Sequence, residues 1–344
     1  MASDNDIIAL ATAGWRALME GQQPGPGFVA ATGCLPAGAH GMEMAMRRAM
    51  AGSTPTGRSA LHASVKRTAR VLFGRDQHFE GIPIEGAAVW LCLLGPDGYV
   101  REAALRALDV PPPTSFLAAT LLRRLNDWAG PVREVAASRL PNLVDATAPE
   151  VLGPAMAALL PQALTFDRGW LRGASALEAM LRRPGVAAAV TTYLRDAPAG
   201  PKPTALPILL RLGLGEAALR DLAHRAVSPG LRAMAVEALV SGRARWQEGW
   251  FRYWIDKPMG VAGRRPALAY RDLAGPPATE AEALTFARDP SARVRRAVLD
   301  GALETRPPWL GRLADILADD PWPSVRDRAV VAARHASQAA SRSE

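Results

Sequence analysis

Two stretches near the end of the chain, DPSARVRRAVLDGAL at residues 289–303 and DPWPSVRDRAVVAA at residues 320–333, share one design. Each begins with an aspartate turn and continues with a Val–Arg pair. Small apolar residues then follow at the spacing of one helical face. The turn offers an N-cap acceptor, and the alanines let a neighbouring helix approach closely. The repetition predicts stacked helical hairpins.

Similar stretches recur toward the N-terminus, each with an arginine directly after an aliphatic residue. The six arginines are Arg101, Arg133, Arg172, Arg232, Arg295 and Arg326. They are separated by 32, 39, 60, 63 and 31 residues, so each long gap is about twice the basic unit. We therefore expect two degenerate copies, near residues 202–211 and 261–268. A hairpin of about 30 residues cannot bury its apolar faces alone, so the copies must stack.

The repeated arginines are predicted to be structural. We expect each one to reach along the stack to an acidic group or to free carbonyl groups of the next hairpin, with its stem on apolar surface. The alternative is that the six together form a binding stripe.

The pattern resembles HEAT-like repeats of the short, phycobilisome-lyase-related kind, whose second helix opens Asp-x-x-x-x-Val-Arg-x-x-Ala. Residues 289–297 follow this motif with an offset of one and residues 320–329 follow it similarly. The resemblance covers roughly residues 85–335. It implies an all-α fold, a right-handed α-solenoid of about eight hairpins, and a scaffold or adaptor role. Some members of that group are partners in cofactor attachment, and some relatives bind damaged DNA.

The chain departs from the motif in places. The copy at 167–180 reads Trp-Leu-Arg, and the two middle units have lost the signature. We predict three parts: a diverged N-terminal helical region at 1–85 that caps the array, the repeat solenoid at 86–336, and a disordered tail at 337–344. In the first part, helices are expected at 6–20, from about Met42, and at 59–73.

The segment GRARWQEGWFRYWIDKPMGVAGRR at 242–265 is the candidate partner-binding site. Trp246, Trp250 and Trp254 are four residues apart, so a helix would carry them as one ridge. The surrounding cations are Arg243, Arg245, Arg252, Lys257, Arg264 and Arg265. Tryptophan and arginine anchor many interfaces, and cations with aromatics also bind phosphates and bases. The alternative is that the ridge fills the core and the arginines lie on its solvated rim.

These observations predict a non-enzymatic scaffold that holds a protein partner on the concave face of the solenoid. The second hypothesis is a nucleic-acid-binding protein that places the same arginines on phosphates. The least favoured is a base-excision enzyme similar to the HEAT-like, AlkD-like DNA glycosylases. Asp256 and Asp272 lie near the tryptophans and arginines, but both are more simply interpreted as caps or ion-pair partners.

No motif for nucleophilic, metal-dependent or nucleotide-hydrolysing catalysis occurs, and the five histidines are dispersed. The methionines Met42, Met44, Met46 and Met50 are interpreted as core packing. The segment Gly213–Ala218 satisfies G-x-G-x-x-A, but no strand flanks it, so it is interpreted as a helix-turn-helix connection. Cys34 and Cys92 have no partner at ligand spacing and are predicted to be two small buried side chains. We expect no cofactor and no metal.

Composition places the chain among globular proteins rather than disordered or fibrous ones. The formal net charge is +8, but only three of the 41 basic residues are lysine, which is typical of a GC-biased genome. No stretch reaches the roughly 18 consecutive apolar residues that span a bilayer, and the chain starts acidic rather than basic. We expect a cytoplasmic protein with no membrane association.

Overall fold

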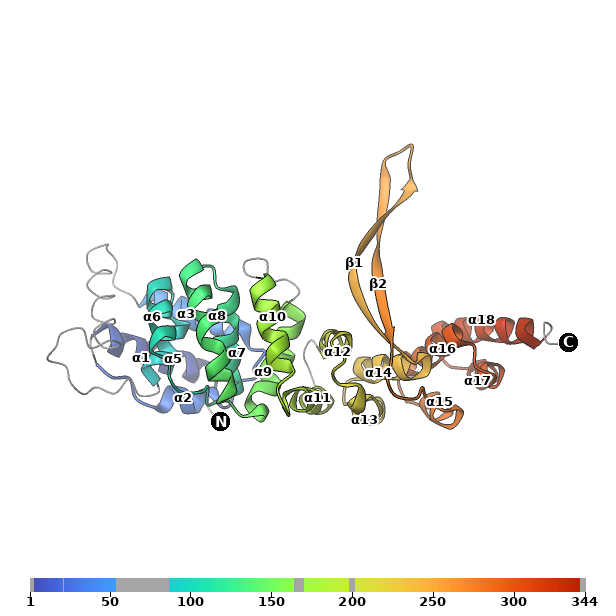
Figure 1. Cartoon of the computed structure of the whole chain (residues 1–344), viewed down its shortest axis with the longest axis horizontal. Coiled ribbons are helices and arrows are strands. Elements are labelled where there is room, and N and C mark those ends of the chain that lie inside the picture. The colour runs from blue at the N-terminus through green and yellow to red at the C-terminus, as the bar shows by residue number, and fades with distance from the viewer. Residues whose placement is uncertain (1–2, 21, 54–86, 164–169, 198–201, 341–344) are drawn as a thin grey trace. The chain divides into compact units, whose positions relative to one another are not determined.

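The computed structural model describes residues 3–20, 22–53, 87–163, 170–197 and 202–340. The described part of the chain is mostly helical and adds one two-stranded antiparallel sheet (Figure 1). Contacts divide the chain into two compact units, Met1–Val190 and Thr191–Glu344. Each unit is described by itself.

The first unit is built from helices that cover a strongly apolar pair, α5 and α7, every residue of which is buried except Ser115. The N-terminal helices α1 and α3 both pack against α5. The elements are α1 (Asp4–Met19), α2 (Gly27–Thr32), α3 (His40–Gly52), α5 (Ala87–Leu94), α6 (Gly98–Ala107), α7 (Ser115–Leu122), the 3-10 helix η1 (Arg123–Asn126), α8 (Gly130–Asp145), α9 (Pro149–Ala163), α10 (Trp170–Leu181) and α11 (Val186–Asp196), which crosses the unit boundary.

The second unit contains the sheet, which stands out from the helices as a long twisted ribbon (Figure 1). Three of its helices pack in sequence, α14 on α16 and α16 on α18, while α13 and α17 form hairpins with α14 and α18. The elements are α12 (Lys202–Arg211), the 3-10 helix η2 (Glu216–Ala218), α13 (Leu219–Arg225), α14 (Pro229–Ser241), β1 (Arg243–Asp256), β2 (Val261–Asp272), α15 (Glu280–Phe286), α16 (Ala292–Thr305), α17 (Leu310–Leu317) and α18 (Pro323–Ala340).

The repeated arginines occupy equivalent positions wherever their side chains are described. Each donates from Nη1 to the carbonyl oxygen six residues earlier: Arg101 to Gly95, Arg133 to Asp127, Arg232 to Ala226, Arg295 to Asp289 and Arg326 to Asp320, at 2.6–2.8 Å. The acceptor belongs to the turn of the arginine's own hairpin. The side chain of Arg172 lies outside the described residues.

Three of these arginines also reach the aspartate in the turn of the next hairpin. Both Nε and Nη2 donate to one carboxylate in each case: Arg101 to Asp127, Arg232 to Asp289 and Arg295 to Asp320. The same aspartates accept from the backbone N–H two residues on, so each also stabilises the turn that precedes the next long helix. One carboxylate thus joins the turn regions of two successive hairpins.

The predicted N-terminal helices at 6–20 and from about Met42 correspond to α1 and α3. Within them Ile7, Ala11, Met46 and Met50 are buried, whereas Leu10 is exposed. The predicted helix at 59–73 and the predicted boundary at 85 lie outside the described residues. At the other end α18 continues through Ala340, so residues 337–340 are helical rather than a disordered tail.

The prediction of a helix at 242–265 is wrong, because this segment forms the hairpin of β1 and β2. A spacing of four residues is compatible with one face of a helix and also with one face of a strand, so it could not decide between them. Trp, Phe and Tyr favour strands, and Gly249 disfavours a helix interior. The turn closes with Gly260 at φ 69° and with the Met259 N–H donating to Asp256 Oδ1 at 3.1 Å.

The expected degenerate repeat at 261–268 is also wrong, since these residues belong to β2. The expected copy at 202–211 does form a helix, α12. Because Arg232 bonds directly to Asp289 and α14 packs on α16, no repeat is missing between them. The 63-residue gap is one repeat with a β-hairpin inserted between α14 and α15.

Candidate binding surface on the β-hairpin

Paired charges join the two strands at the base of the hairpin and fix β1 to helices of the second unit. Arg243 bonds to Asp272 across the strands at 3.2 Å, and Arg245 pairs with Glu237 at 3.0 Å and with Glu304. Burial, followed by the nearby Asp300 charge, raises the pKa of Glu237 despite the opposing charge of Arg245. Arg243 and Arg245 therefore have internal partners.

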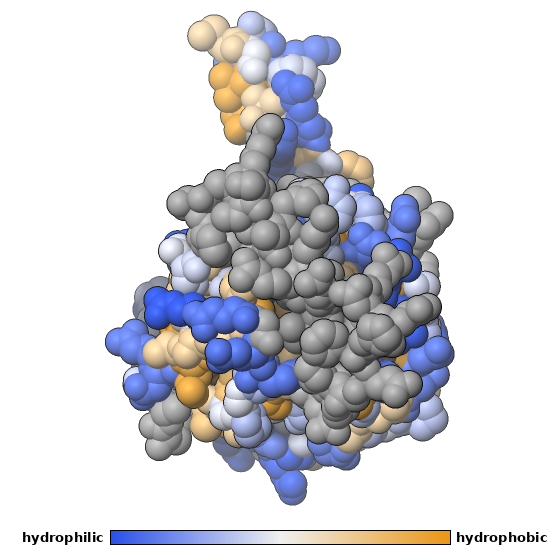
Figure 2. Space-filling model, turned by 90° about the vertical axis from the view of Figure 1, so that its left-hand side faces the viewer, coloured by the Kyte–Doolittle hydropathy of each residue, from blue (hydrophilic) through white to orange (hydrophobic). Residues whose placement is uncertain are grey.

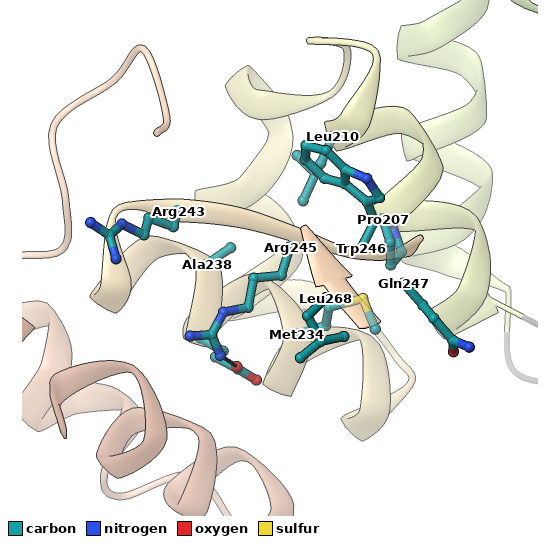
Figure 3. A pocket seen from close by; sticks show the side chains of 10 residues that line it. Pro207, Leu210, Met234, Ala238, Arg243, Arg245, Trp246, Gln247 and Leu268 are labelled. Carbon is teal, nitrogen blue, oxygen red and sulfur yellow. Dashed lines mark hydrogen bonds and ion pairs between the residues drawn. The ribbon is translucent and has the colours of Figure 1, made fainter. Parts of the chain in front are cut away.

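Trp246 lies at the same base, beside a hollow of about 250 Å³ between β1, α12 and α14. In Figure 3 its indole lies next to Pro207 and Leu210 of α12, while Arg243 and Gln247 point away from it. The indole N–H is buried and finds no acceptor among the described residues. Trp246 thus packs the hairpin against the helices of the second unit. The alternative interpretation, in which the tryptophans fill the core, therefore holds for Trp246.

A β-bulge separates Trp246 from the other two tryptophans. Gln247 pairs with Leu268 and Gly249 with Ala267, so Glu248 is an extra residue that reverses which face the following side chains occupy. Beyond the bulge, Trp250, Arg252 and Trp254 share one face, whereas Trp246 lies on the other. The predicted single ridge of three tryptophans is therefore wrong.

The outer part of the hairpin, residues 249–267 beyond the bulge, is exposed on both faces. Trp250, Ile255 and Met259 are 62%, 65% and 75% exposed, which is far from the burial of an ordinary core residue. Figure 2 shows apolar and hydrophilic side chains side by side over this projecting end. The other large exposed apolar residues here are Phe251, Tyr253, Trp254 and Val261, while Leu268 and Tyr270 are exposed nearer the base.

Four cations of the outer part have no ion pair with any carboxylate of the described residues: Arg252, Lys257, Arg264 and Arg265. Two of them lie over aromatic rings instead. Arg252 is 4.8 Å from the ring centre of Trp254, and Arg265 is 5.8 Å from that of Phe251. These cations remain available to an external anion.

Arg252 and Arg264 are direct cross-strand partners. Directly opposed side chains in an antiparallel pair are only about 5 Å apart at their Cβ atoms, and like charges in that position destabilise the sheet. No carboxylate of the described chain offsets this repulsion. The hairpin therefore holds two positive charges together at a cost to its own stability.

The sequence reasoning identified this segment but missed several of its exposed residues. Phe251, Tyr253, Ile255 and Met259 were not singled out, although the run WFRYWIDKPM at 250–259 contains all of them. The aromatic content of this run, which favours strands, was the signal that could have predicted a β-hairpin here.

A second feature that sequence reasoning missed is a buried charge network in the first unit. Glu43 on α3 accepts from Arg123 at 2.6 Å and from Arg124, and Arg124 also bonds to Asp127 at 3.0 Å. Burial alone would raise the pKa of Glu43, but the charges of Arg124 and Arg123 and the hydrogen bond from His40 lower it to about 2. This network joins α3 to η1, and its role is structural.

Other candidate sites bring no chemistry together. Among the described residues no group of histidine, cysteine, aspartate or glutamate could hold a metal ion. Gly213–Ala218 connects α12 to η2 and α13, which confirms the helix-turn-helix interpretation. Both cysteines are free; Cys92 is buried as predicted, whereas Cys34 is exposed. Asp256 closes the hairpin turn and Asp272 pairs with Arg243, as the ordinary interpretation expected.

A second hollow, of about 400 Å³, lies on the first unit beside the exposed rings of Tyr99 and Trp128. Its acidic groups are already used: Asp97 caps α6 by accepting from the Tyr99 N–H, and Glu102 pairs with Arg106 at 2.7 Å. The outer hairpin is therefore the stronger candidate, since its charged groups lack partners.

Within the described ranges, every helix is too short or too polar to cross a bilayer. No protein-family model matches the chain, and comparison with curated proteins and with solved structures finds no match either.

Proposed function

We propose that this chain is a HEAT-like, right-handed α-solenoid that acts as a non-enzymatic scaffold in the cytoplasm and binds a protein partner through the outer part of its β1–β2 hairpin. The solenoid is supported by the arginines that recur with the same hydrogen bonds, and by the successive packing of α14, α16 and α18. Such an array buries its core between repeats and leaves an inserted ribbon free for recognition.

The observation that carries the binding role is the exposure of Trp250, Phe251, Tyr253 and Trp254 on a ribbon whose neighbouring arginines lack internal partners. Interfaces between proteins are enriched in aromatic residues, methionine and arginine and depleted in lysine, glutamate and alanine. The run at 250–259 is rich in the favoured types, with four aromatic residues, one methionine and one arginine, beside Asp256 and Lys257. A partner that covers it would bury apolar surface now in contact with water.

The experiment compares the natural chain with three variants of the full chain as bait for co-purification and mass spectrometry. In the first variant residues 248–267 are replaced by Asn-Gly, which closes the Gln247–Leu268 pair with a two-residue turn. The second is Trp250→Ala. The matched control is Trp322→Ala, an equally exposed tryptophan outside the hairpin.

We expect both hairpin variants to keep the circular dichroism spectrum and melting temperature of the repeats, and to lose a protein that the natural chain and Trp322→Ala retain. Retention of the same proteins by all four chains would contradict the proposal. Unfolding of Trp250→Ala would contradict its placement on the surface.

Nucleic-acid binding through the same hairpin is the second candidate, favoured by the four cations without carboxylate partners. Against it, Arg243 and Arg245 are used internally. A fluorescence titration with duplex and single-stranded DNA at about 50 and 200 mM salt separates the candidates, because phosphate contacts lose affinity steeply over that range. An absence of binding at the lower salt would eliminate this candidate.

A further inference from the structure

Beyond the Glu248 bulge, one face of the hairpin combines opposed arginines with tryptophans. This paired-arginine face consists of Trp250, Arg252 and Trp254 of β1 with Ala262, Arg264 and Pro266 of β2. Resting on the proposed function, we infer that it binds an acidic segment of the partner protein, with a carboxylate lying between Arg252 and Arg264.

The charge of the face suits an anionic ligand. Arg252 and Arg264 oppose each other directly, and the described chain gives neither of them a carboxylate. A carboxylate placed between them would replace one repulsion with two attractions. The planar guanidinium group donates two parallel hydrogen bonds to a carboxylate, which a lysine cannot do.

The aromatic rings prepare the face for that contact. The Trp254 ring lies 4.8 Å from the Arg252 guanidinium, which limits the orientations that this side chain takes in the free protein. Trp250 and Trp254 lie on either side of Arg252 along β1 and are about half exposed or more. When a partner covers these two rings, they would exclude water from the ion pairs that Arg252 and Arg264 make with its carboxylate, and those ion pairs would become stronger.

The surroundings of the face favour a protein over the other anionic partners. Ile255, Met259 and Val261 are exposed beside it, and Lys257 is the one lysine of the hairpin. A nucleic acid would leave these aliphatic side chains without apolar contacts. A second copy of this chain is disfavoured because its formal charge is +8.

Two measurements on the full chain test this inference. The first is an anisotropy titration with a fluorescein-labelled glutamate homopeptide, a glutamine homopeptide of the same length as control, and an oligodeoxythymidylate. We expect binding of the glutamate peptide alone, weakened about tenfold or more by Arg252→Gln or Arg264→Gln, as the loss of one charge-assisted contact predicts. The control variant Arg225→Gln, on α13 outside the hairpin, should leave it unchanged. Equal or tighter binding of the oligodeoxythymidylate would overturn the inference.

The second measurement is photo-crosslinking in cells with p-benzoylphenylalanine in place of Ala262, on the paired-arginine face, or of Ala267, on the opposite face of the same strand. We expect position 262 to capture a protein through a peptide that contains aspartate or glutamate, and Arg252→Glu to abolish the product. A captured peptide without acidic residues would overturn this inference and leave the proposed function standing. Crosslinks only to nucleic acid or to a second copy would overturn both.

Discussion

Arg232 on α14 donates two hydrogen bonds to the carboxylate of Asp289, at 2.9 and 3.1 Å, across 57 residues that include the whole β-hairpin. The equivalent pairs Arg101–Asp127 and Arg295–Asp320 are 26 and 25 residues apart. The bond that joins successive hairpins is thus the same with and without the insertion. The hairpin therefore interrupts the sequence but not the packing of the repeats.

Asp127→Asn is expected to lower the free energy of unfolding by about 3 kcal/mol or more, because it leaves the fully buried Arg101 without its counter-charge. Urea denaturation measures the change. Asp97→Asn is the matched control, since Asp97 lies in the preceding turn but accepts only the Tyr99 N–H. Asparagine caps helices about as well as aspartate does, so the control should change little. Equal losses in the two variants would refute a joining role for Asp127.

Arg264→Gln is expected to stabilise the hairpin by about 0.2–1 kcal/mol, because it removes the repulsion from Arg252. Hydrogen exchange of the outer β1 amides should accordingly slow. Arg243→Gln provides the contrast, since it removes the ion pair with Asp272 and should make exchange faster. Faster exchange in Arg264→Gln would show that the arginine supports the ribbon rather than straining it.

The pH dependence of stability should contain a contribution from Glu43. Its pKa is lowered from 4.5 to about 2 by Arg124 and Arg123 despite burial, so the folded state binds its proton at a lower pH than the unfolded state does. The stabilisation, about 3 kcal/mol, is present above pH 4.5 and is lost as pH falls toward 2. Denaturation curves between pH 6 and 2.5 should therefore show a shallower pH slope for Glu43→Gln. An unchanged slope would exclude Glu43 as its source.

Gly153→Ala is expected to lower the free energy of unfolding by about 1–3 kcal/mol, although alanine is the better helix former. A Cβ at this position of α9 would lie 2.7 Å from the Ala189 backbone and side chain on α11. Gly52→Ala is the control, because a Cβ there meets nothing within 4 Å. It should instead raise stability by about 0.5–1 kcal/mol. A melting-temperature comparison of the two variants checks both expectations.

The sequence revealed those features that local chemistry specifies. An aspartate turn followed by a Val–Arg pair forms its own hydrogen bonds, as Arg295 does to the carbonyl of Asp289, and can be recognised without its neighbours. The hairpin was misassigned because tryptophans four residues apart fit helix and strand alike. The separation of Trp246 from Trp250 depends on the pairing of Gln247 and Gly249 with β2, which no spacing within one segment discloses. The contact of Glu43 with Arg123, 80 residues away, is likewise a product of tertiary packing.

The ribbon leaves and re-enters the helices at a single point, where Leu273 donates to the Gly242 carbonyl at 2.8 Å and Arg243 faces Asp272. An element with both ends so close can exchange its outer part for another hairpin of different side chains, while Arg245 and Trp246 at the base keep their contacts with the helices. Evolution could accordingly alter what this molecule recognises while its architecture stays constant, and a protein engineer could graft a new recognition loop at the same junction.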